Sequence, residues 1–246
     1  FFDATHTFQP KYLICCWDMG SQTFRNQIYR DYKANRPAPP KELIPQFELV
    51  KEVVSAFDIP NIGIENYEAD DCIGTLAHDF KKQHEVLILS GDQDLLQLVD
   101  SNISVALMKK GMGNYDVYHQ RNFYEKKGLE PKQIIDMKAL VGDPADHYPG
   151  VKGIGEKTAL KLLKEYETIE HLLENKDQLS ERLKANLEED IDMLYISREL
   201  ATIKCDVPIS CTLDEAIWQF NQEKVEDTLK ALDIKPPKEL YLSHIE

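Results

Sequence analysis

The segment Val86-Leu87-Ile88-Leu89-Ser90-Gly91-Asp92-Gln93-Asp94 joins a short apolar run directly to two acidic residues. Such a run, bounded by a turn, is typical of a strand that is buried on both faces of a parallel sheet. A second apolar run, at 12–17, ends in the same way at Asp18. In open α/β sheets, ligands bind beyond the carboxyl ends of the strands. Both strand ends are therefore candidate positions for chemistry.

The rest of the first half alternates between helical and strand patterns. Apolar residues at helical spacing predict helices at 43–57, 69–80 and 95–99, and shorter apolar runs predict strands at 61–65, 103–108 and 115–118. This alternation indicates an α/β fold with a mainly parallel sheet flanked by helices. After residue 120 the pattern is helical with short loops. We therefore predict an α/β domain at 1–114 and a helical region at 115–246. Because residues 1–8 resemble the end of an amphipathic helix, we expect the first domain to be N-terminally incomplete.

The composition favours a cytoplasmic protein without a membrane partner, because no apolar stretch approaches the roughly 20 residues that span a bilayer. The five cysteines are odd in number and lack CxxC spacing, which favours buried thiols over disulfides or zinc. The formal net charge of −14 argues only weakly against a nucleic-acid partner. Local basic clusters matter more than the sum, and carboxylates that bind cations exaggerate the acidity.

Carboxylates gather at predicted strand ends and helix starts. Each has a structural explanation, since an acidic residue stabilises the first turn of a helix by about 0.3–1 kcal/mol. Together, however, carboxylates at one edge of a sheet would repel one another unless cations lay between them. An all-oxygen ligand set suits Mg²⁺ or Mn²⁺, and two such ions about 4 Å apart form a hydrolytic site. The predicted metal ligands are Asp18, Glu68, Asp70, Asp71, Asp92, Asp94, Asp143 and Asp146.

Two basic elements are candidates for contact with a phosphate backbone. The first, Pro149–Ala159, is rich in glycine and lysine and leads into a predicted helix near Gly155. Glycines allow close approach of the backbone, and the N–H groups of a helix N-terminus bind phosphate. The second, at 25–41, mixes cations with aromatic residues, as single-stranded nucleic acid requires. A surface lysine face and a solvated loop are the structural alternatives.

These motifs, in this order, resemble the bacterial and phage 5′-3′ exonuclease/flap endonuclease family, which includes stand-alone enzymes and the N-terminal domain of DNA polymerase I. The matching segments are Trp17-Asp18 with Phe24-Arg25, Tyr32-Lys33-Ala34-Asn35-Arg36, Tyr67-Glu68-Ala69-Asp70-Asp71, Gly91-Asp92-Gln93-Asp94-Leu95, Gly142-Asp143 with Asp146, and Pro149–Ala159. The resemblance implies a PIN/resolvase-like nuclease core with a helical arch at about 22–45. It also implies a helical DNA-binding region with a helix-hairpin-helix element at about 131–170.

The resemblance further implies how the site is divided. Asp18, Glu68, Asp70, Asp71 and Asp92 are expected around one metal, and Asp94, Asp143 and Asp146 at the second, with Asp71 and Asp92 between the two ions. The expected catalytic residues are Lys33, Arg36, Asp71 and Asp92. DNA contacts are expected from Arg25, Tyr32, Lys33, Arg36, Gly150, Lys152, Gly153, Gly155, Lys157 and Thr158. Backbone carbonyls of Val151 and Ile154 are expected to hold K⁺.

The implied function is structure-specific hydrolysis of DNA at 5′ flaps and 5′ ends in replication and repair. We expect 5′-phosphate and 3′-hydroxyl products, a monomer, and no small-molecule cofactor. The chain departs from the family in lacking an upstream strand that ends in an Asp-Gly pair. It also carries Gln93 where a lysine is frequent, and His147-Tyr148 in place of the usual polar-apolar pair after Asp146. A non-catalytic DNA-structure-binding paralogue or fragment is therefore the main alternative. A PIN-type RNase is the second.

Overall fold

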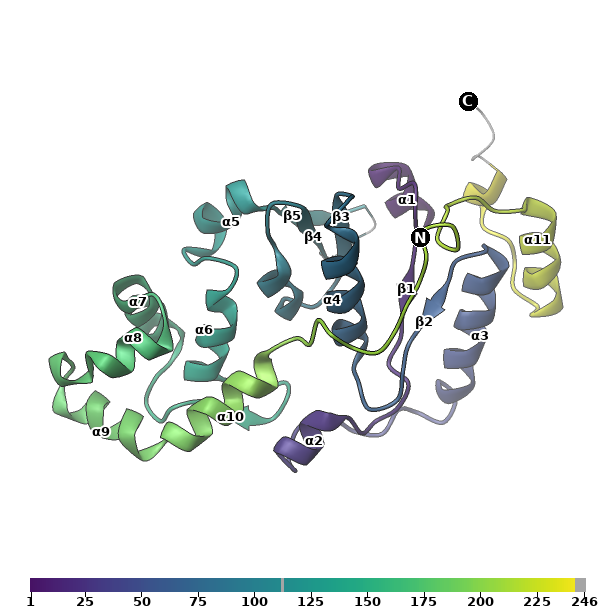
Figure 1. The fold of residues 1–246 in the computed structure, drawn as a ribbon. Helices are drawn as coiled ribbons and strands as arrows, with labels where there is room; N and C mark the ends of the chain where they lie inside the picture. The colour runs from purple at the N-terminus through teal and green to yellow at the C-terminus, as the bar shows by residue number, and fades with distance from the viewer. Residues whose placement is uncertain (112, 242–246) are drawn as a thin grey trace.

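The computed structural model describes residues 1–111 and 113–241 (Figure 1). Residue 112 and residues 242–246, which fall in the predicted 1–114 and 115–246 regions, lie outside the described residues. In chain order, the elements are α1 (Phe2–Phe8), β1 (Cys15–Cys16), α2 (Phe24–Ile28), α3 (Ile44–Ala56), β2 (Asn61–Ile62), α4 (Ala69–Phe80), β3 (Val86–Ser90), η1 (Asp94–Leu98), β4 (Ile103–Met108), β5 (Tyr115–Tyr118), α5 (Gln120–Lys127), α6 (Gln133–Val141), β6 (Gly142–Asp143), β7 (Tyr148–Pro149), α7 (Glu156–Tyr166), α8 (Ile169–Glu174), η2 (Lys176–Gln178), α9 (Glu181–Glu189), α10 (Ile191–Ala201), α11 (Gln222–Ala231) and η3 (Lys238–Tyr241).

The predicted α/β class is confirmed, with parallel pairing of β1 with β2 and of β3 with β4. The described strands do not form one sheet, however. β1 and β2 make one pair, β3, β4 and antiparallel β5 make another sheet, and β6 pairs with β7 beyond the predicted strands. Among residues 1–111 and 113–241, no helix is long and apolar enough to cross a membrane.

Strand β3 differs from the expectation of burial on both faces. Ile88 is buried against Leu95 and Leu96, whereas Leu87 and Leu89 are 38% and 39% exposed. Side chains alternate along a strand, so the two leucines lie on the face opposite Ile88. An apolar run predicts a strand, but it does not say how many faces are covered.

The helical half has its own core, and its last long helix leads back to the first half. In α7, Ala159, Leu162, Leu163 and Tyr166 are buried at helical spacing, and α10 packs on α6. After α10 the chain runs past α4 and β1 towards α11, which lies beside α3 (Figure 1). The segment 200–207 thus connects the helical half to the helix that begins at the carboxylates Glu68–Asp71.

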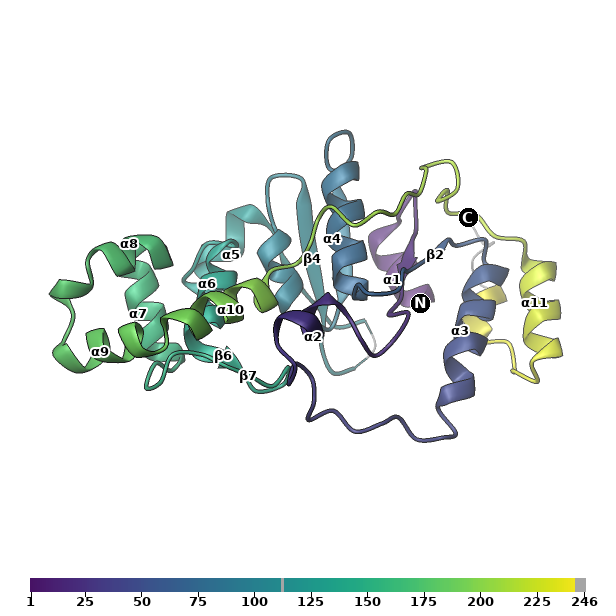
Figure 2. The same ribbon diagram turned by 60° about the horizontal axis from the view of Figure 1, so that its bottom comes forward.

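The predicted arch region, 22–45, contains little helix. Helix α2 covers only Phe24–Ile28, and α3 begins at Ile44. Between them, residues 30–35 form turns, and residues 36–40 continue in a loop without regular structure at the edge of the molecule (Figure 2). Pro37, Pro39 and Pro40 lie in this loop. Since proline lacks the backbone N–H that a helix needs, the loop remains extended.

Candidate active site

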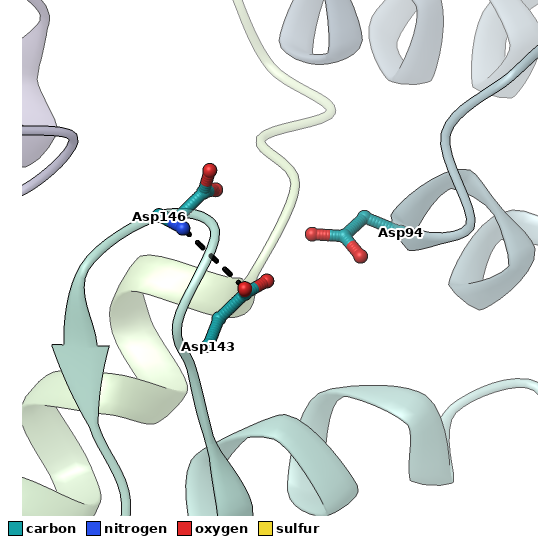
Figure 3. A group of neighbouring side chains, drawn as sticks. All are labelled: Asp94, Asp143 and Asp146. Atoms are coloured by element: carbon teal, nitrogen blue, oxygen red, sulfur yellow. Dashed lines mark hydrogen bonds between the residues drawn. The ribbon is translucent and has the colours of Figure 1, made fainter. Parts of the chain in front are cut away.

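Three carboxylates form a compact group between the two halves. Asp94 opens η1 directly after β3, Asp143 ends β6, and Asp146 lies in the loop to β7. One oxygen atom of each lies within 4.8 Å of the others (Figure 3). Asp143 Oδ1 also accepts hydrogen bonds from the backbone N–H of Ala145, at 2.8 Å, and of Asp146. The turn at 143–146 is therefore held by Asp143 itself, and Asp146 is directed to the same point as Asp94.

A close backbone contact holds the base of this turn. Gly142 has φ +79°, and a Cβ atom there would lie 2.3 Å from the backbone nitrogen of Gly150. Only glycine permits both this conformation and this approach. The short pairing of β6 with β7 thus joins the acidic turn to the hairpin that follows it.

Sequence reasoning did not single out Lys138. Its ammonium group contacts both Asp94 and Asp143. Burial lowers the pKa of Lys138, but the two carboxylates outweigh burial and raise it. The sequence offered only a weak signal, which is that Lys138 precedes Asp143 by five residues on the helix that leads into β6. A cation at these carboxylates would compete with this lysine for their oxygens.

A second group of carboxylates comes from the strand ends and the start of α4. Asp18 Oδ1 accepts the backbone N–H of Ala69 at 2.8 Å, so the end of β1 meets the first turn of α4. Asp92 lies after β3, and its Oδ1 accepts the backbone N–H of Asp94 at 2.8 Å. Burial, followed by repulsion from Asp92, Glu68 and Asp94, raises the pKa of Asp70 to about 7. The two groups are therefore neighbours.

Asp70→Asn is expected to stabilise the protein at neutral pH in EDTA. The folded-state pKa of Asp70 is raised to about 7 from 3.8, so the unfolded chain releases this proton first. The carboxyl group therefore lowers stability as the pH rises from about 4 to about 7, and the loss persists above pH 7. Removing it should add on the order of 2–4 kcal/mol near pH 8 and little near pH 4.

Thermal and urea unfolding across this pH range measures the effect of Asp70→Asn. Asp79→Asn, at an exposed position on the same helix α4, is the matched control. A stability difference that does not change between pH 4 and pH 8 would contradict the expectation.

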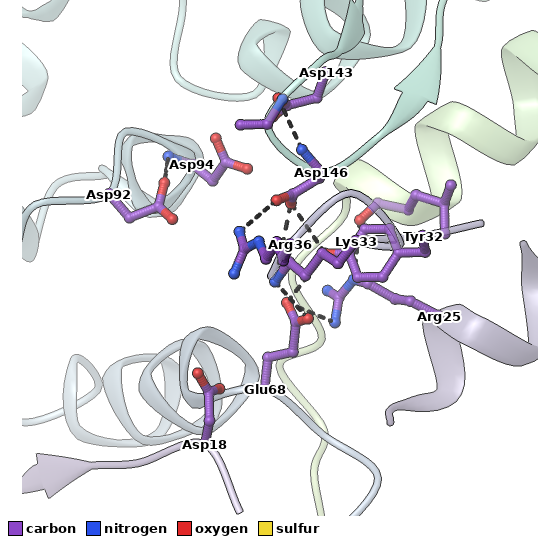
Figure 4. A network of polar contacts seen from close by, with 12 residues as sticks. Asp18, Arg25, Tyr32, Lys33, Arg36, Glu68, Asp92, Asp94, Asp143 and Asp146 are labelled. Carbon is purple, nitrogen blue, oxygen red and sulfur yellow. Dashed lines mark hydrogen bonds and ion pairs between the residues drawn. The ribbon is translucent and has the colours of Figure 1, made fainter. Parts of the chain in front are cut away.

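The segment at 31–36 reaches both carboxylate groups (Figure 4). Lys33 Nζ lies 2.6 Å from Glu68 Oε1 and 4.0 Å from Asp146 Oδ2. The guanidinium of Arg36 lies 2.7 Å from Asp146 Oδ1, and its side chain is 54% exposed. Two of the cations predicted to act on a phosphate thus lie at the edge of the predicted metal site. Arg36 also remains accessible from outside.

Tyr32 does not present its ring as a stacking surface. It is 4% exposed and packs against the ring of Tyr148. Its hydroxyl group lies 3.2 Å from Glu68 Oε2 and 3.1 Å from Asp146 Oδ2. The expected contact of Tyr32 with DNA does not fit this burial, because the ring and the hydroxyl group of Tyr32 both contact other residues of the protein.

Asp71 and Arg25 also differ from the expectation. Asp71 is fully buried, and Arg25 donates to its two oxygens at 2.7 and 2.8 Å. The same oxygens accept the backbone N–H groups of Glu68 and Lys204. A carboxylate with four protein donors has no oxygen left for an ion. This geometry does not fit Asp71 as a metal ligand or catalytic residue, or Arg25 as a DNA contact.

The hairpin at 149–155 connects the acidic turn to α7. Gly153 has φ +77°, and α7 begins after its N-cap residue Gly155. Side chains of Val151 and Ile154 are buried, whereas Lys152 and Lys157 are exposed and Thr158 is half-buried. Asn186 of α9 donates to the Lys152 carbonyl at 2.8 Å. Exposed lysines thus flank the hairpin, and α7 begins without a side-chain cap. The contact of these groups with a phosphate backbone stays a prediction.

Known protein families match both halves of the chain. A family model described as the 5′-3′ exonuclease N-terminal resolvase-like domain matches residues 1–128, and one described as the 5′-3′ exonuclease C-terminal SAM fold matches residues 129–225. The 5′-3′ exonuclease of Bacillus subtilis is 53% identical over 232 residues, which cover 94% of this chain and 78% of that protein. DNA polymerase I of the same organism is 43% identical over 227 residues, which cover 91% of this chain and 26% of that protein.

Solved structures support the same fold. A structure of T5 5′-exonuclease with bound zinc ions has a TM-score of 0.67 at 22% identity, and the match covers 94% of this chain and 87% of that one. The catalytic core of Rad2 in complex with DNA substrate has a TM-score of 0.53 at 18% identity, covering 86% and 70%. The sequence matches extend over both halves of the chain. The chain therefore belongs to the 5′-3′ exonuclease family.

Proposed function

We propose that this chain is a divalent-metal-dependent 5′-3′ exonuclease and flap endonuclease that hydrolyses DNA phosphodiester bonds. The observation that carries the proposal is the convergence of carboxylates from four segments on one place. Burial raises the pKa of Asp94 to about 6 against the opposing effect of Lys138, and repulsion from Asp92 and Asp143 adds a smaller contribution in the same direction as burial. A fold that needed only helix capping would not crowd acidic groups in this way.

The carboxylates suit two hard cations. Asp94, Asp143 and Asp146, whose oxygens lie within 4.8 Å of one another, would hold one ion. Asp18, Glu68, Asp70 and Asp92, which do not form such a compact group among the described residues, would hold the other. All of these donors are carboxylate oxygens, which favours Mg²⁺ or Mn²⁺ over metals that prefer histidine or cysteine. Two such ions supply an ionised water near neutral pH and neutralise charge on the attacking and leaving oxygens. Asp71 is left out of this set because its oxygens are engaged.

Basic side chains of the chain would bind the phosphate groups of the DNA. Lys33 and Arg36, beside Glu68 and Asp146, would bind the scissile phosphate and stabilise the negative charge that develops on it. The hairpin at 149–155, with Lys152, Lys157 and the N-terminus of α7, would bind the phosphate backbone of the duplex without reading bases.

Further parts of the proposal concern the surroundings of the reaction. The α/β domain at 1–114 would supply most of the cleavage site, and the helical region at 115–246, with a hairpin element at about 131–170, would add Asp143 and Asp146 and bind the duplex. Backbone carbonyls of Val151 and Ile154 would hold K⁺ at the hairpin. The protein would act as a cytoplasmic monomer on 5′ flaps in replication and repair, giving 5′-phosphate and 3′-hydroxyl ends.

The test is cleavage of a 5′-labelled flap duplex. We expect cleavage near the junction in Mg²⁺ or Mn²⁺, none in EDTA, and a 5′-phosphate on the product. The assay is run with this chain and with a form extended upstream, because the family resemblance predicts an additional strand there. A matched RNA flap separates this function from that of a PIN-type RNase. Flap binding in EDTA without cleavage by either form would instead identify a non-catalytic DNA-structure binder.

A further inference from the structure

The guanidinium group of Arg25 is the centre of a buried polar cluster. Arg25 lies on α2 and is 2% exposed. Besides its two hydrogen bonds to Asp71, it donates to the carbonyl of Leu200 at 3.0 Å and to that of Thr202 at 2.9 Å. The planar fork of arginine is suited to such a set of acceptors, which a lysine ammonium could not satisfy together. Arg25 is therefore held inside the protein on several sides.

The cluster joins three segments that are distant in the sequence. Arg25 comes from the first helix of the arch region, Asp71 from the first turn of α4, and Leu200, Thr202 and Lys204 from the end of α10 and the chain that leaves it. Figure 2 shows α2 close to the end of α10, and the two helices are in contact. Lys204 closes the cluster by donating its backbone N–H to Asp71 at 2.9 Å.

Glu68 connects this cluster to the site. It precedes Asp71 by three residues, and its backbone N–H donates to Asp71 Oδ2 at 3.0 Å. Its carboxylate lies 3.7 Å from the Arg25 guanidinium and also accepts hydrogen bonds from the Tyr32 hydroxyl and the Lys33 ammonium group (Figure 4). The position of Asp71 therefore determines where the first turn of α4 lies, and with it Glu68, Asp70 and the Lys33 that Glu68 holds.

We infer that Arg25 and Asp71 form a positioning pair, which holds the arch region and the first turn of α4 against the segment returning from the helical half. The inference rests on the proposed function, since the groups positioned are Glu68, Asp70 and Lys33. The pair acts on the reaction through these groups and contacts neither DNA nor an ion. It also explains why two adjacent aspartates, Asp70 and Asp71, have different surroundings.

A double-mutant cycle tests the pairing. The variants are Arg25→Met, Asp71→Leu and the double variant, and unfolding is measured in EDTA. Each single variant leaves a buried charge unpaired, so we expect each to lower the melting temperature by several degrees. The double variant should lose clearly less than the sum of the two. Strict additivity would overturn the pairing. Asp71→Asn, which keeps the shape of the side chain, is used where the single variants fold poorly.

Metal binding separates positioning from ligation. Stabilisation by Mn²⁺ is titrated by thermal unfolding for Asp71→Asn and for the control Asp92→Asn, which alters an exposed carboxylate of the proposed metal group. We expect the apparent Mn²⁺ affinity to fall tenfold or more in Asp92→Asn and clearly less in Asp71→Asn, which leaves every proposed ligand in place. An equal loss in both variants would make Asp71 a ligand and overturn the inference.

The local effect is read by hydrogen exchange and by kinetics. In Asp71→Asn and Arg25→Met, amides at 66–72 and 202–206 should exchange at least tenfold faster, while those of α7 stay unchanged. The single-turnover rate at saturating flap should fall tenfold or more in these variants. The affinity for the flap in EDTA and the salt dependence of that affinity should stay unchanged. A salt slope lower by about one would instead place Arg25 on a phosphate. If no form of the chain cleaves, the proposed function fails, and the cycle, the exchange and the Mn²⁺ titration still decide the role of the pair.

Discussion

Asp143→Asn is expected to lower the rate of flap cleavage by about 10²–10³-fold, corresponding to about 3–4 kcal/mol of lost stabilisation of the transition state. Asn retains the Oδ1 acceptor that receives the backbone N–H groups of Ala145 and Asp146, so the turn at 143–146 should persist. What is lost is the negative charge beside Asp94 and Asp146. The expected defect is therefore one of cation binding and not of folding.

Single-turnover cleavage of a labelled flap, together with a Mn²⁺ titration, measures the effect of Asp143→Asn. Higher Mn²⁺ should recover part of the rate. Asp177→Asn is the matched control, since Asp177 lies in the helical half and pairs with Lys184. Asp92→Ala is expected to show a comparable loss. If Asp92→Ala and Asp143→Asn both cleave at the rate of the parent chain, the proposed two-ion hydrolysis is wrong.

Lys33→Met and Arg36→Met are each expected to reduce the cleavage rate by about 10²–10³-fold, as the loss of one well-placed donor does in other enzymes. Both cations lie at the edge of the carboxylate groups, paired with Glu68 and Asp146. A phosphate bound at the carboxylates would lie within reach of both side chains. Because the loss is in the transition state, flap affinity should change much less than the rate.

The measurement is the single-turnover rate and the flap affinity of each arch variant. Arg30→Met removes an exposed cation from the same segment and serves as the control. An equal loss of rate and affinity in Lys33→Met would show that Lys33 binds the ground state only. No change of rate in either variant would remove both residues from the reaction.

Local patterns predicted much of the fold. Helix α4 covers Ala69–Phe80 as predicted, and α3 and β4 lie within or at the predicted ranges. These segments carry their information in the spacing of apolar residues, which reports one face of a helix or strand. The single parallel sheet was not reproduced among the described residues, because the pairing of strands depends on partners elsewhere in the chain. The exposure of Leu87 and Leu89 likewise depends on which other segments cover that face of the strand.

Acidic residues at strand ends and helix starts could be identified from their positions in the chain. The partners of each charge could not. Lys138 escaped notice because an isolated lysine on a helix is usually solvated, and its contact with Asp94 and Asp143 exists only after α6 packs on η1.

Residues Asp70 and Asp71 separate what the sequence can predict from what depends on tertiary structure. By itself, the sequence determined the order of strands and helices, the eight carboxylate positions and the resemblance to a nuclease family. Neighbouring residues on a helix point about 100° apart, so one aspartate of the pair must face away from the other. Which one is fully enclosed and paired was decided by Arg25 and by the backbone of Lys204, more than 130 residues further along the chain. Burial of a charge requires partners, and only the packed structure brings those partners together.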